Sequence, residues 1–82
     1  MTGMDVFNFL NNMAFSANLL VSFIDEDGTL IGNIYCRLSG GIEISEGLHC
    51  VWRKSVRCLC FGMRNGCATV RFIVLKGEEN EV

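Results

Sequence analysis

The stretch RCLCFGMRNGCATVRFIVL, residues 57–75, places two apolar runs on either side of a short connection that contains Asn65 and Gly66. An Asn-Gly pair between runs of β-branched and aromatic residues is a strong hairpin signal, because both residues tolerate the positive φ angles of a tight turn. The second run, residues 69–75, has few polar interruptions, which is typical of a strand covered on both faces or of an edge that accepts a partner. The stretch therefore predicts a β-hairpin with Arg64 at its tip.

Upstream of the hairpin, alternating apolar and polar residues predict three further strands, at 19–24, 29–38 and 42–52. The acidic segment 25–28 joins the first two, and we interpret it as a turn because the other ligands of an EF-hand calcium loop are missing. Gly32, in the middle of the second strand, indicates a bulge or a sharp bend. In the third, Glu46 and Gly47 interrupt or bulge the strand, which resumes through Trp52. With the hairpin strands 56–62 and 69–75, the sequence predicts five strands.

The N-terminal segment predicts a short helix over residues 4–15. Val6, Leu10 and Met13 recur at helical spacing, and Thr2 or Asp5 can cap its start. Its polar face has no Lys or Arg, which argues against a helix that lies on a membrane surface. We therefore expect this helix to dock on the sheet.

The composition is that of one small, mainly β domain. The chain has 82 residues, half of them hydrophobic, and no proline, which argues against disorder and against a linker. We expect a single domain over residues 1–77 and a flexible acidic tail over 78–82. So much apolar surface in so short a chain also suggests burial by partners. No apolar run reaches the roughly 20 residues of a membrane-spanning helix, so no membrane partner is expected.

The charges are segregated along the chain. The net charge is −2, yet residues 48–76 contain no acid and six Lys or Arg residues. This asymmetry suits an anionic partner, although ordinary solvated strand faces explain it about as well.

The reactive residues do not form a recognisable catalytic or metal-binding pattern. The five cysteines, at 36, 50, 58, 60 and 67, are odd in number and follow no signal peptide, which favours a reduced intracellular setting. Their spacing does not match a zinc knuckle, so we interpret them as small buried hydrophobes. His49 lies in an apolar strand pattern with no dyad partner. We predict no catalysis, no metal and no cofactor.

Arg64 and Asn65 are the candidate nucleic-acid contacts. A guanidinium plane can stack on a base or pair with phosphate, and an amide can bond a base edge. An Arg-Asn-Gly turn is a weak signal by itself, and its weight comes from the surrounding pattern.

That pattern resembles the Sm and Sm-like (LSm) family in three places. Residues 6–10, VFNFL, resemble its opening helix. Residues 20–34 resemble the first half of the first Sm motif, a strand, an acidic turn and a second strand with a glycine in its middle. Residues 64–66 followed by 70–75 resemble the second motif, an Arg-Gly or Asn-Gly turn before a final apolar strand. Residues 38–42 lack the Asp and the Met-Asn pair with which the first motif normally continues.

The resemblance implies a fold and a function. The fold is a short N-terminal helix followed by a strongly bent five-stranded antiparallel small barrel of the SH3-like type. The function is that of a non-catalytic RNA-binding subunit in an Sm-type ring, in a splicing snRNP of the spliceosome or in RNA processing and decay, in the nucleus or cytoplasm. Its partners are U-rich single-stranded RNA and other Sm or LSm subunits.

The resemblance also implies roles for individual residues. Arg64, Asn65, Gly66 and Gly41 would form the RNA site. The fourth strand of one subunit would pair with the fifth of the next, an interface that includes Cys58, Cys60, Val70, Phe72 and Val74. Two alternatives stay open: both strand edges are covered within a monomer, or the chain is a small β-barrel module, regulatory or viral, that binds protein and not RNA.

Overall fold

The computed structural model describes residues 1–12 and 17–79. A short helix is followed by five strands, with a 3-10 helix (η1) before the fourth. The elements are α1 (Gly3–Asn11), β1 (Asn18–Ile24), β2 (Leu30–Cys36), β3 (Ile42–Ile44), η1 (Leu48–Cys50), β4 (Lys54–Arg64) and β5 (Cys67–Glu79). The predicted mainly β fold with a short N-terminal helix is therefore confirmed.

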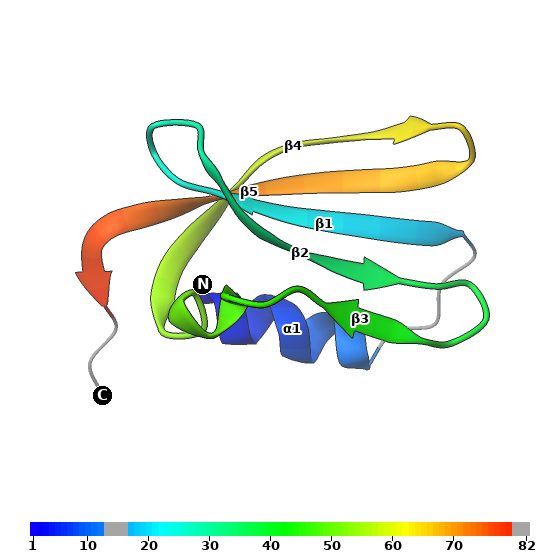
Figure 1. Cartoon of the computed structure of the whole chain (residues 1–82), viewed down its shortest axis with the longest axis horizontal. Coiled ribbons are helices and arrows are strands. Elements are labelled where there is room, and N and C mark those ends of the chain that lie inside the picture. Colours follow the sequence, from blue (N-terminus) through cyan, green and yellow to red (C-terminus); the bar gives the residue numbers. More distant parts are fainter. Residues whose placement is uncertain (13–16, 80–82) are drawn as a thin grey trace.

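The five strands form one sheet in the order β3-β2-β1-β5-β4. All neighbouring strands are antiparallel except β1 and β5, which run parallel. The expectation of an antiparallel sheet is thus wrong at this one ladder. β3 and β4 are the two ends of the sheet, as Figure 1 shows, and among the described strands they do not pair with each other. The expected closure into a barrel is therefore not seen.

The core lies between α1 and one face of the sheet. The rings of Phe23 in β1 and Phe72 in β5 stack with centroids 5.7 Å apart, and Val6 and Leu10 of α1 are buried on the same side. Gly32 has the irregularity predicted for it, since the pairing of β1 with β2 shifts register beside it. A Cβ on Gly32 would lie 2.6 Å from Ser45 Oγ, so its missing side chain lets the chain before η1 pass close to β2.

Both predicted caps act at the start of α1. The N–H of Asp5 donates to Thr2 Oγ1 at 3.2 Å, and the N–H of Thr2 donates to the Asp5 carboxylate at 2.9 Å, which completes a capping box. The helix begins at Gly3 and ends at Asn11. The part of the prediction that concerned residues 13–15 lies outside the described residues.

The region before β4 corrects the sequence prediction. A strand was expected to resume through residues 48–52, but the chain forms η1 there. Gly47, with φ of 91°, turns the chain in the left-handed region immediately before it. Leu48 and Val51 are buried, and the N–H of Met4 donates to Trp52 O at 3.1 Å. The apolar residues that suggested a strand instead tie η1 to α1.

The hairpin of β4 and β5 is present and longer than predicted. Asn65 and Gly66 form its two-residue turn with φ angles of 54° and 77°, the positive values that a type I′ turn requires. β4 begins at Lys54, and β5 continues to Glu79, so the first two residues of the expected flexible tail belong to a strand. The rest of that tail, 80–82, lies outside the described residues.

Candidate binding surface

Three exposed apolar side chains lie close together on β4, and two of them are the most exposed apolar side chains of the sheet. Leu59, Phe61 and Met63 are 53%, 81% and 67% exposed. These residues lie in the second half of the strand, close to the hairpin turn, and Figure 1 shows that this end of the hairpin lies on the side of the molecule away from α1. Large apolar groups that remain in water mark interaction surfaces when they cluster.

The pairing of β4 with β5 assigns these side chains to faces of the sheet. Phe61 lies opposite Val70 and Met63 opposite Ala68, and Val70 packs against the core. Directly opposed residues of an antiparallel pair project to the same face, so Phe61 and Met63 extend the core-facing side of the sheet beyond α1. A register shift between Cys58 and Cys60 places Leu59 in a bulge.

The other face of the sheet has no helix on it among the described elements and carries polar and basic groups. Ser22 lies beside Arg71 in the β1–β5 pair, and Ser22 Oγ donates to Asn33 Oδ1 at 2.8 Å. A groove of about 470 Å³ crosses this open face. Alternate residues of β4 border it from both sides of the pleat: Cys60 and Gly62 belong to the open face, whereas Phe61 and Met63 are directed by the pairing toward the core-facing side. The rest of its lining is Leu20, Ser22, Thr69 and Arg71. Arg57, opposite Ile73, also belongs to this face.

The two predicted halves of the RNA site lie at the same end of the sheet. Asn65 and Gly66 form the exposed hairpin turn, and Gly41 is exposed in the connection between β2 and β3. Asn18 lies between them, because it pairs with Cys67 at the start of β5 and its Oδ1 accepts from the N–H of Leu38 at 2.7 Å. The backbone of Arg64 ends β4; its side chain is not among those the structure describes.

The predicted subunit-interface residues have different environments. Phe72 and Val74 are buried in the core, and Val70 is half-buried. From Cys67 to Ile73, β5 is hydrogen-bonded to β1 on one side and to β4 on the other, so the free edge expected of the fifth strand is absent over these residues. Cys58 and Cys60 lie exposed on β4, which is an end strand. An interface role for these two cysteines stays a prediction.

The cysteines are more exposed than the sequence suggested. Cys36 is buried, and burial raises the pKa of its thiol, which keeps it protonated and unreactive. Cys50, Cys58 and Cys60 are exposed and Cys67 is half-buried, so the interpretation as buried hydrophobes holds for Cys36 and is wrong for the three exposed cysteines. Within residues 1–12 and 17–79, no cluster of His, Cys, Asp and Glu has the arrangement of a metal site.

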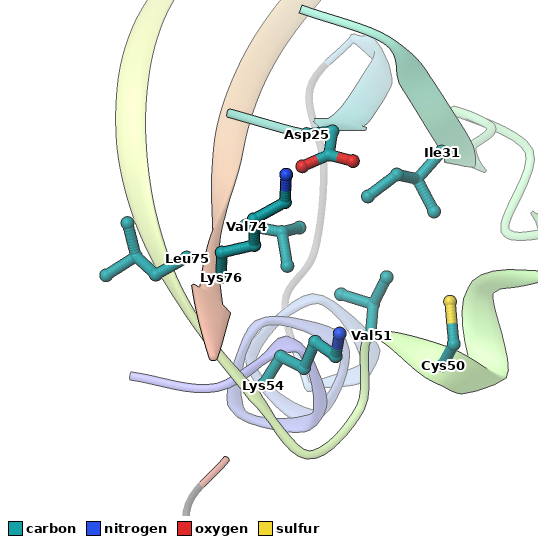
Figure 2. Close-up of a pocket in the computed structure, with 8 residues that line it drawn as sticks. All are labelled: Asp25, Ile31, Cys50, Val51, Lys54, Val74, Leu75 and Lys76. Carbon is teal, nitrogen blue, oxygen red and sulfur yellow. The ribbon is translucent and has the colours of Figure 1, made fainter. Parts of the chain in front are cut away.

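A small cavity of about 90 Å³ lies at the opposite end of β5 from the hairpin turn. Figure 2 shows Asp25, Lys54 and Lys76 beside it, from the turn after β1, from β4 and from β5. The N–H of Lys76 donates to the Glu26 carboxylate at 3.2 Å, which holds β5 against the acidic turn. The cavity is too small for a nucleobase, and this end of the molecule is an internal junction between elements.

The hairpin tip was predictable from the sequence, whereas most of the surface around it was not. Asn18 becomes a neighbour of the tip, and Ser22 a neighbour of Arg71, only through the parallel pairing of β1 with β5. The one available signal was that Ser22 and Arg71 each interrupt an otherwise apolar strand. No helix among the described residues is long and apolar enough to cross a membrane. Comparisons of the chain with protein-family models, with curated proteins and with solved structures found no match.

Proposed function

We propose that the chain is a non-catalytic subunit of an RNA–protein assembly that binds single-stranded RNA on the open face and the hairpin tip. The observation that carries the proposal is the open face, on which Arg71, Ser22 and Thr69 line a groove of about 470 Å³. Arg57 lies on the same face, farther from the hairpin tip along β4. Basic side chains beside hydrogen-bonding groups suit the phosphates and base edges of single strands.

The Sm-like resemblance in the sequence supports the same function. The finer proposal is a ring subunit that binds U-rich RNA beside Asn65, Gly66 and Gly41, in pre-mRNA splicing or RNA turnover, in the nucleus or cytoplasm. Because residues 67–73 of β5 are paired on both sides within the chain, subunits would join through the end strands β3 and β4 and not through a β4–β5 exchange.

Fluorescence anisotropy with a short labelled oligouridine tests the RNA proposal. The double variant Arg57→Ala, Arg71→Ala removes two cations from the open face and should weaken binding about tenfold or more, with a smaller salt dependence. Arg53→Ala removes an exposed cation that precedes β4 and should change binding much less. Oligouridine that does not bind the wild type, or equal losses in both variants, would contradict the proposal.

A second candidate, a module that binds only protein, is favoured by the exposed apolar side chains Leu59, Phe61 and Met63. Native mass measurements with and without oligouridine separate the two candidates. An assembly that forms without any RNA affinity supports the protein module. A strict monomer at tens of micromolar, even with candidate partners present, would contradict the ring.

A further inference from the structure

The outer edge of β4 is open from Arg57 to Arg64 among the described residues. At the start of the strand, Thr2 bridges to Ser55, and the N–H of Val56 donates to Met1 O at 2.8 Å. Beyond that point β4 is the last strand of the sheet, and no described strand pairs with its outer side. An edge strand with free N–H and C=O groups is a template for an added strand.

The core-facing side of this edge offers apolar contacts. Phe61 and Met63 project to that side, and Val70, which lies opposite Phe61, lines an apolar cavity of about 190 Å³. Phe9 of α1, which is 64% exposed, lines the same cavity. A strand added at β4 could therefore place every second side chain against Phe61 and Met63 and continue the core.

The open side of this edge offers positive charge. Arg57 projects there, and Arg71 lies one strand further in, opposite Cys60. No acid occurs between Gly47 and Gly77 in the sequence. A second copy of β4 contains no acid that could pair with Arg57 or Arg71, which disfavours self-pairing. An acidic strand would instead be attracted.

We propose that the outer edge of β4 binds an extended segment of a partner protein in which apolar and acidic residues alternate. The apolar residues pack beside Phe61 and Met63, the acidic residues face Arg57 and Arg71, and the backbones pair as neighbouring strands. The proposal rests on the assembly half of the proposed function and is independent of the RNA half.

Four synthetic peptides test this recognition by isothermal titration calorimetry. The probe is acetyl-VEVEVEV-amide. One control has the same composition in the order VVEEVEV, one carries Lys in place of each Glu, and one has proline at the central Glu. Proline removes a backbone donor, so strand pairing predicts binding at least tenfold weaker than that of the probe. The Lys peptide should not bind, and the reordered peptide should also bind at least tenfold more weakly.

Two variants, each of which removes an exposed apolar side chain, test whether the peptide binds at β4. Phe61→Ser should weaken binding of the probe about tenfold, whereas Leu38→Ser, which removes a 57% exposed apolar group after β2, should leave it unchanged. Circular dichroism verifies that both variants fold. A third variant, Arg57→Glu, should also weaken binding of the probe. It should make that binding less sensitive to salt, because one cation of the open face is lost.

Three results would overturn the proposal. The first is equal binding of the probe and the proline peptide, which would show mere charge attraction. The second is an equal loss of probe binding in the Phe61→Ser and Leu38→Ser variants. The third is a multimer of the chain alone that Phe61→Ser dissociates, which would make a second copy the occupant of the edge. Probe binding by a chain that does not bind oligouridine supports this proposal while contradicting the RNA proposal.

Discussion

Gly3 is the residue on which the contact between α1 and the segment after η1 depends. A Cβ at this position would lie 2.5 Å from Val51 O and 2.7 Å from Val51 Cγ1. Val51 is fully buried, so it has little room to move. The first residue of a helix thus has to be the one with no side chain.

We expect Gly3→Ala to lower the free energy of unfolding by about 1–3 kcal/mol, the range of overpacked cores. The sign of this change in the free energy of unfolding is the test, because replacing glycine by alanine in a helix ordinarily stabilises it. Gly41→Ala is the control, since its Cβ would make an ordinary contact of 3.6 Å with Arg37 Cδ. Urea unfolding measures both variants. A Gly3→Ala protein as stable as the wild type would contradict this packing.

The capping box makes stability depend on pH. Hydrogen bonds from the backbone and side chain of Thr2 lower the pKa of Asp5 below its ordinary 3.8. A carboxyl whose pKa is depressed on folding stabilises the protein above its unfolded pKa, and this stabilisation is lost as the pH falls through the folded value. The Asp5→Asn variant should therefore be less stable than the wild type at about pH 6, and this difference in the free energy of unfolding should vanish at about pH 2.

Urea unfolding at the two pH values checks this expectation. Thr2→Ala removes the partner of Asp5 and should cost about 1 kcal/mol. In that background the pH-dependent effect of Asp5→Asn should be smaller. An effect of Asp5→Asn that is the same at both pH values would contradict the capping account.

At the scale of elements, the β4–β5 hairpin is the part that the sequence predicted best. Its turn is local chemistry, since Asn65 and Gly66 supply the two positive φ angles without help from the rest of the fold. Gly66→Ala should destabilise the protein by about 1 kcal/mol or more, because alanine resists a φ of 77°.

Gly62 provides the matched control for the turn. It lies in β4 with open space around its Cβ position and no positive φ. Gly62→Ala should therefore be neutral or slightly stabilising in thermal unfolding. If Gly66→Ala and Gly62→Ala destabilised the protein equally, the positive φ of Gly66 would not be the reason for its effect.

Features set by distant contacts were predicted less well. The apolar pattern of residues 48–52 fits a strand and a buried turn equally well. The close packing of Val51 against Gly3 favours the turn, which is η1. The parallel pairing of β1 with β5 follows from how the chain crosses the sheet, which no local pattern records. For the same reason, the tip residues of the candidate site were predictable, whereas Asn18 beside the tip and the pairing of Ser22 with Arg71 were not.

At the scale of the whole molecule, strand order decides which edge can meet a partner. A long apolar fifth strand suggested that β5 would be an edge, yet β5 lies between β1 and β4 and contributes Phe72 and Val74 to the core. Of the two end strands, β4 is much longer than β3. Its outer side has Phe61 and Met63 on one face and Arg57 on the other. The proposed partner depends on the claim that this edge is free.

Amide hydrogen exchange of the free protein, followed residue by residue by NMR, tests that claim most directly. We predict slow exchange for the amides of residues 70–73, because this part of β5 is paired on both sides. From Arg57 to Arg64, the β4 amides that point away from β5 should exchange fast and become protected when the alternating acidic peptide is added. Uniformly slow exchange along β4 in the free protein would contradict the account, because it would show that the edge is already covered.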